Sequence, residues 1–237
     1  KIKESIVNKQ ISQEQIDSRC RKILLAKKWF GLDKSKLVEE TDLFKDLTTN
    51  QTEVLNRKLV KGSLTLLNNS QDLIPIKKLD TLKIASLSIG ESGKIFQSTL
   101  SKYASVDHFH ISEQHTDMER KELLNELSSY NLVIVGVHKS NVHAWKSYNI
   151  HKNTDVLLQT LGVQSKLVLT VFSNPYSLSD LLMTYAFDGL MVAYQNSEVA
   201  QEYAAQAIFG GIGVSGKLPV SNDHFSLGDG MKTEAIR

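Results

Sequence analysis

The chain has 237 residues, and its 28 Lys and Arg side chains nearly balance its 26 Asp and Glu side chains. A hydrophobic fraction of 41% excludes an intrinsically disordered protein. The net charge of +2 argues against an electrostatic nucleic-acid binder, which needs a basic face to displace phosphate counterions. The one cysteine, Cys20, excludes an internal disulfide and a Cys-rich zinc site. No run of ~20 apolar residues is present, so the sequence predicts no membrane-spanning helix.

The N-terminal segment indicates a piece of a longer chain. Lys1 is not a methionine, and residues 1–10 are polar and charged, without the apolar core of a signal peptide. A helix is predicted next, because Ser12 and Gln15 have capping-box spacing and Gly31 supplies a stop. Apolar residues recur between these points at helical intervals: Ile16, Cys20, Ile23 and Leu24. We assign residues 1–34 to this helical segment and the poorly periodic residues 35–49 to a linker.

The remainder of the chain predicts an α/β fold. A second helix is expected from Asn50 to Gly62, followed by a short apolar run and a polar turn. Strands are expected at residues 84–89, 106–111, 132–137, 167–172 and 190–194. Helices of about three turns separate them, which is typical of a three-layer α/β/α sandwich with a mostly parallel sheet of about five or six strands. We assign residues 50–222 to this sandwich and residues 223–237 to a C-terminal tail.

Two glycine-rich segments resemble phosphate-binding patterns. Gly211, Gly213 and Gly216 have the spacing G-x-G-x-x-G, but they follow a helix, whereas phosphate cradling needs a strand before and a helix after the glycines. We interpret them as a flexible turn. Residues 90–94, GESGK, stand between a strand and a helix, where they either cradle an anion or make an ordinary turn of this fold.

The histidines give no specific sign of a metal site. Most of them fall between His108 and His151, and no pair has the i, i+4 spacing of a zinc enzyme. We therefore expect neutral surface or cleft histidines and no metal or cofactor. Residues 137–154 contain no Asp or Glu at all. Trp145 and Tyr148, in the same loop, either stack on a sugar ring or pack on a neighbouring domain.

Several segments in order resemble family 3 glycoside hydrolases. Residues 16–32, IDSRCRKILLAKKWFGL, are similar to the closing helix of the family's catalytic barrel, and residues 62–75, GSLTLLNNSQDLIP, to the entry into its second domain, with Asn68 in place of the usual Lys. LVIVGVH at 132–138 and FSNPYSL at 172–178 resemble second-domain segments of the N-acetylglucosaminidase branch. FGGIGVSGKLPV at 209–220 and FSLGDGMKT at 225–233 resemble the terminal elements, from which Asp229 and Met231 depart.

The resemblance implies a retaining mechanism in which an aspartate of the barrel attacks the anomeric carbon. The β-glucosidase branch places its acid/base glutamate on the second domain, whereas the N-acetylglucosaminidase branch uses a histidine on a barrel loop. The lack of a carboxylate at 137–154 favours the second branch. It implies a fragment, inactive alone, whose partners are the barrel domain of the same parent chain and a β-linked N-acetylglucosamine glycan. Residues 1–34 would then be an orphaned barrel helix, for which we expect dimerisation through its apolar face.

The side chains expected to line the sugar cleft or face the barrel are His138, Lys139, Ser140 and Asn174, because they follow strand ends. Ordinary loop or interface packing would explain the same residues. Two other functions stay open: a free-standing doubly wound module for a small ligand or nucleotide, and a purely structural module.

Overall fold

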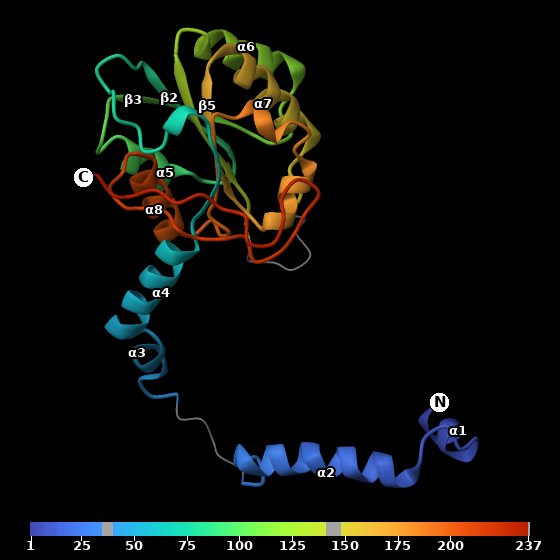
Figure 1. Ribbon diagram of the computed structural model, residues 1–237. Helices are drawn as coiled ribbons and strands as arrows, with labels where there is room; N and C mark the ends of the chain where they lie inside the picture. The colour runs from blue at the N-terminus through green and yellow to red at the C-terminus, as the bar shows by residue number, and fades with distance from the viewer. Residues whose placement is uncertain (35–39, 141–147, 237) are drawn as a thin grey trace. The chain divides into compact units, whose positions relative to one another are not determined.

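The structure, a computed structural model, describes residues 1–34, 40–140 and 148–236 (Figure 1). The chain divides into two compact units, residues 1–49 and 50–237. None of its described helices has the length and apolar character that crossing a bilayer requires.

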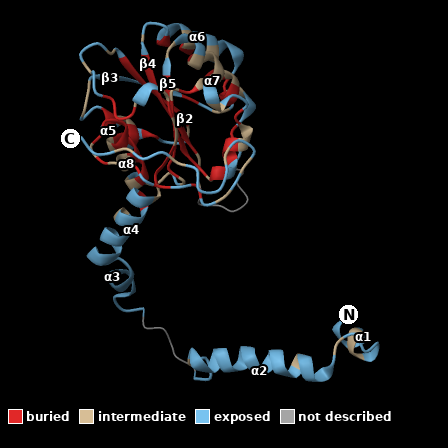
Figure 2. Cartoon of the chain, viewed as in Figure 1, coloured by how far each residue is buried: buried red, intermediate tan, exposed pale blue. Residues whose placement is uncertain are grey.

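The first unit consists of helices with exposed apolar side chains. It contains α1 (Ile2–Val7), α2 (Gln13–Trp29) and α3 (Leu43–Leu47), and none of the three buries a residue (Figure 2). The predicted capping box begins α2: the backbone N–H of Gln15 donates to Ser12 Oγ, and that of Ser12 to Gln15 Oε1, both at 3.1 Å. Ile23, Leu24 and Leu25 are each more than half exposed. The short helix α3 lies inside the segment predicted to be a linker.

The second unit is built on a six-stranded sheet with the strand order β1-β6-β5-β4-β2-β3. Its strands are β1 (Thr65–Asn69), β2 (Ile84–Gly90), β3 (Val106–Ile111), β4 (Leu132–His138), β5 (Lys166–Phe172) and β6 (Gly189–Val192). All neighbouring strands are parallel except β1, which pairs antiparallel with β6 and carries an irregularity between Leu66 and Asn68. The mostly parallel sheet is as predicted, and β1 adds a strand where the sequence indicated only an apolar run and a turn.

Helices cover both faces of the sheet, which confirms the three-layer fold (Figure 1). One core cluster joins the sheet to α4 (Asn50–Ser63), α5 (Lys94–Leu100) and α8 (Glu198–Ile208). The other joins it to α6 (Asp117–Leu127) and α7 (Lys152–Gln164). The alternation of side chains along β4 divides them between the faces: Leu132 and Ile134 enter the first cluster, while Val133, Val135 and Val137 enter the second. Burial on both faces explains why this strand reads as a continuous apolar run.

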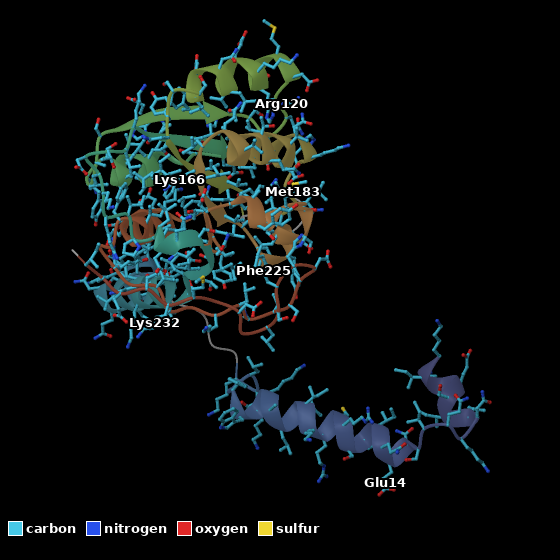
Figure 3. All side chains as sticks on the ribbon, turned by 45° about the horizontal axis from the view of Figure 1, so that its top comes forward. Glu14, Arg120, Lys166, Met183, Phe225 and Lys232 are labelled. Atoms are coloured by element: carbon cyan, nitrogen blue, oxygen red, sulfur yellow. The ribbon has the colours of Figure 1, made fainter. Side chains whose placement is uncertain are left out.

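The C-terminal segment packs on the second unit. Met231 forms an isolated antiparallel bridge with Leu66, and Ile236 donates its backbone N–H to Gly210 O at 2.8 Å. Phe225, labelled in Figure 3, packs against the second core cluster. The residues predicted to be a tail are therefore bound to β1 and to the end of α8.

The glycines at 211–216 serve close packing. They follow α8, as the sequence indicated, and a Cβ on Gly216 would collide with the backbone oxygens of Ser63 and Leu64. A Cβ on Gly213 would lie 2.6 Å from Thr233 O. These contacts explain the glycines without a phosphate.

Candidate functional site

A cavity of about 330 Å³ lies at the carboxyl ends of β2 and β4. These strands mark the point where the chain reverses its direction of travel across the sheet, because β3 lies on one side of β2 and β4, β5 and β6 lie on the other. Open α/β sheets bind their ligands in the crevice at such a switch point. The cavity is lined mainly by polar residues: Gly90, Glu91, Ser112, Glu113, Gln114, His138, Lys139 and Ser140.

An ion pair dominates the cavity wall. Lys139 follows β4, Glu113 follows β3, and the distance from Lys139 Nζ to Glu113 Oε2 is 2.6 Å. The two side chains are only 13% and 18% exposed. The other carboxylate oxygen, Oε1 of Glu113, is buried without a hydrogen-bond partner among the described residues. Because both side chains are largely buried, removing either one would leave the other as an unpaired charge in the interior, which would destabilise the fold.

The turn after β2 is shaped by Gly90. Its φ of +90° is a conformation that residues with a Cβ rarely adopt. A Cβ here would lie 2.7 Å from His138 O and 3.3 Å from Glu113 Cγ. The next residue, Glu91, donates its backbone N–H to His138 O at 3.0 Å. Glycine therefore lets the turn approach β4 closely enough to close this side of the cavity.

The ring of His138 lies in the protein interior. It is fully buried, stacks on Phe172 with ring centroids 4.5 Å apart, and meets the edge of Phe96 at 6.0 Å. Burial lowers the pKa of His138 from 6.5 to about 4, while the hydrogen bond to Asn196 opposes that change. The imidazole is therefore neutral at pH 7.

A hydrogen-bond network fixes the tautomer of His138. Asn196 Oδ1 lies 2.8 Å from His138 Nδ1 and also 2.8 Å from Gln201 Nε2. Since Gln201 Nε2 is a donor, Asn196 Oδ1 is the acceptor and His138 Nδ1 carries the proton. Gln201 also donates to Ser92 O at 3.1 Å. The network thus ties the end of β4 to the turn after β2 and to the turn after β6.

The unprotonated nitrogen of His138, Nε2, is buried and has no hydrogen-bond partner among the described residues. A Cβ on either Gly93 or Gly136 would collide with this nitrogen. The two glycines therefore provide the space for the ring, and the side chain acts as part of the core.

The structure brings together some of the predicted site residues. Lys139 and Ser140 line the cavity with the end of β4, whereas Asn174 follows the neighbouring strand β5 and is not among the cavity residues. Asn174 is partly buried and caps a 3-10 helix, η2 (Pro175–Asp180), by accepting the backbone N–H of Tyr176 at 3.1 Å. Trp145, which the sequence suggested as a stacking residue, lies outside the described residues.

The sequence did not single out Glu113 or Gln201. Residues 137–154 contain no carboxylate, but Glu113 reaches the cavity from the loop after β3. Its position directly after a strand was the available signal. Within the described ranges, no group of three His, Cys, Asp or Glu side chains could hold a metal ion.

No family model matches the sequence. The chain is 23% identical to a Formosa agariphila protein named "Putative beta-xylosidase", over 88% of this chain and 31% of that protein. Among solved structures, a family 3 glycoside hydrolase β-N-acetylglucosaminidase from Paenibacillus matches with a TM-score of 0.62 and 18% identity, over 91% of this chain and 41% of that one. A β-glucosidase from Listeria innocua matches with a TM-score of 0.65 and 17% identity, over 92% of this chain and 34% of that one.

These relatives show the fold of the chain. The predicted resemblance to family 3 glycoside hydrolases is confirmed at that level, since the similar solved structures are members of the family and the match covers more than nine-tenths of the chain. The chain spans less than half the length of each of these relatives.

Proposed function

We propose that this chain is the second domain of a family 3 glycoside hydrolase, joined to the last helix of the catalytic barrel. One observation carries the proposal: the match to the solved structures includes more than nine-tenths of this chain but only 34–41% of theirs. Residues 1–34 correspond to the barrel helix, 35–49 to a linker, 50–222 to the sandwich and 223–237 to the terminal segment. The chemistry resides on the barrel, so this chain alone is inactive.

The cavity at the ends of β2 and β4 supports a role as a wall of the sugar cleft. Its lining combines the Lys139–Glu113 pair with Ser112, Gln114 and Ser140, whose side chains can donate to and accept from neutral hydroxyl groups. Such convergent polar groups suit a hydroxyl-rich ligand. His138 supports this wall from within the core.

The proposed substrate is a glycan with β-linked N-acetylglucosamine. Residues 137–154 offer no carboxylate, and Glu113, one of the two glutamates that line the cavity, is ion-paired with Lys139. A carboxylate that is paired with a cation serves as a hydrogen-bond acceptor more readily than as a proton donor. This arrangement supports the branch whose acid/base group lies on the barrel.

A nucleotide-binding module is the competing function, and the charges of the cavity oppose it. Glu91 and Glu113 both line the crevice where a pyrophosphate would sit, and Lys139 is the single cation among the described lining residues. Two carboxylates repel phosphate oxygens, and the turn at residues 90–94 lacks the spacing G-x-G-x-x-G.

Calorimetric titration of this chain with N-acetylglucosamine and with ATP distinguishes the two functions. We expect N-acetylglucosamine to bind with a Kd of order 1 mM, because only one wall of the cleft is present, and ATP to release no heat of binding at the same concentrations. A control with Lys139→Met removes the cation that lines the cavity in the described part of the chain. ATP binding in the micromolar range that is abolished in Lys139→Met would contradict the glycosidase proposal.

Dimerisation through α2 is the second expectation of this proposal. Ile23, Leu24 and Leu25 are more than half exposed, although a helix taken from a barrel would be covered there. Sedimentation should show a dimer that Leu24→Lys converts to a monomer, while Lys22→Glu on the same helix leaves it intact. A monomeric wild-type chain whose α2 amides are protected from hydrogen exchange would count against this expectation.

A further inference from the structure

Two exposed tyrosines lie side by side beyond the carboxyl end of β5. The ring centroids of Tyr148 and Tyr176 are 6.4 Å apart, with their planes tilted by 45°. The residues are 42% and 45% exposed, so both present aromatic surface to the outside. Adjacent large aromatic residues on a surface mark an interaction site more often than a single exposed one does.

The backbone on which Tyr176 stands is tightly held. Asn174 Oδ1 accepts its N–H, the intervening Pro175 is buried, and Asn222 Nδ2 donates to Pro175 O at 3.3 Å. These contacts fix the first turn of η2 against the C-terminal segment. The ring of Tyr176 is thus presented from a rigid support.

The backbone around Tyr148 is also held by hydrogen bonds. Ser173 Oγ donates to Tyr148 O at 3.2 Å, which ties this residue to the end of β5. Two residues later, Ile150 is buried and donates its N–H to Asp180 Oδ2 at 2.8 Å. Because the backbone at both tyrosines is already ordered, a ligand that binds to the pair incurs little entropic cost for ordering the backbone.

The chemistry of the pair fits a sugar ring. A pyranose has an apolar face of C–H groups and a rim of hydroxyl groups, and tyrosine offers an aromatic face with a polar end. Asn174, which stands next to the pair, uses its Oδ1 to accept the backbone N–H of Tyr176, and its Nδ2 is the donor of the same amide group.

We propose that Tyr148 and Tyr176 form a stacking platform for one sugar ring of a β-linked oligosaccharide, with Asn174 Nδ2 donating to a hydroxyl at its rim. The platform stands at the end of β5, and the polar cavity at the end of the neighbouring β4. An oligosaccharide at this edge of the sheet would meet both. The inference deepens the proposed function, from which it takes the sugar as the ligand class.

The test is calorimetric titration of the 237-residue chain with the β-linked trisaccharides of N-acetylglucosamine, glucose and xylose. We expect at least one to bind, and Tyr148→Ala and Tyr176→Ala each to weaken binding about three- to tenfold, since each removes one aromatic face of the platform. Tyr148→Phe and Tyr176→Phe should retain the affinity. Tyr185→Ala is the matched control, because Tyr185 is 77% exposed and lies in another segment, η3 (Thr184–Ala186).

Three results would overturn the platform: unchanged affinity in both alanine variants, equal weakening in Tyr185→Ala, or no binding of any trisaccharide at about 10 mM. These failures are distinguishable from failure of the proposed function. If the platform fails while N-acetylglucosamine binds and ATP does not, the glycosidase proposal stands without it. Circular dichroism of each variant confirms that the fold is retained.

Discussion

Acidification from pH 7 to pH 4 is expected to lower the free energy of unfolding by about 3 kcal/mol through His138 alone. Burial lowers the pKa of this side chain from 6.5 in the unfolded chain to about 4 in the folded one. Between these values the unfolded chain binds a proton that the folded chain does not, so stability falls as the pH falls through that window. Each pH unit of the difference corresponds to 1.36 kcal/mol.

The comparison that isolates His138 is urea unfolding of the wild type and His138→Phe at pH 7 and pH 4. The phenylalanine keeps a ring between Phe96 and Phe172 but cannot titrate, so the stability difference between wild type and variant should shift by about 3 kcal/mol, in favour of the variant, as the pH falls. His224→Phe is the control at an exposed histidine and should follow the wild type. Identical pH profiles of the wild type and His138→Phe would contradict the buried, neutral imidazole.

Removal of the cation from the cavity is expected to have a comparable effect. Lys139→Met leaves the Glu113 carboxylate largely buried without its partner, and this should reduce the free energy of unfolding by about 2–3 kcal/mol. That value lies below the range for fully buried pairs, because both side chains retain some exposure. The double variant Lys139→Met/Glu113→Gln should recover at least half of the loss, since no unpaired charge remains.

Lys232→Met is the matched control for this pair. Lys232 Nζ lies 2.8 Å from Glu234 Oε1, but the two side chains are 70% and 78% exposed. Water screens such a pair, and its loss should leave the free energy of unfolding almost unchanged. Chemical denaturation at pH 7 measures all four proteins. A Lys139→Met variant no less stable than Lys232→Met would show that the pair in the cavity is not buried.

The elements that the sequence predicted well are those set by local chemistry. Ser12 and Gln15 have capping-box spacing, and their reciprocal hydrogen bonds begin α2 as expected. The central strand β4 was recognisable because burial on both faces demands a continuous apolar run. Neither inference needed knowledge of distant contacts.

Strand β1 was missed because distant contacts define it. Its last two residues, Asn68 and Asn69, are polar and read as a turn. Asn68 donates its side-chain amide to Phe187 O, and Asn69 bonds both the N–H and the carbonyl of Ile74. These partners allow two asparagines to occupy a strand at the edge of the sheet.

The same reason limited the prediction of the site. The ion pair of Lys139 joins residues 26 positions apart in the chain, and no local pattern indicates it. His138 was correctly placed at the end of a strand, but its burial results from Phe96, Phe172 and the glycines beside it. The sequence indicated where His138 stands along its strand. It did not indicate that the side chain is buried, because residues from several separate elements surround it.

The most direct test of the proposed function is the reading frame that precedes the Lys1 codon, followed by assay of the full-length product. We predict a barrel of roughly 300 residues with an aspartate nucleophile and a His–Asp loop, and release of β-linked N-acetylglucosamine by the full-length protein. A reading frame without a barrel, or a full-length protein that cleaves no β-glycoside, would contradict the account.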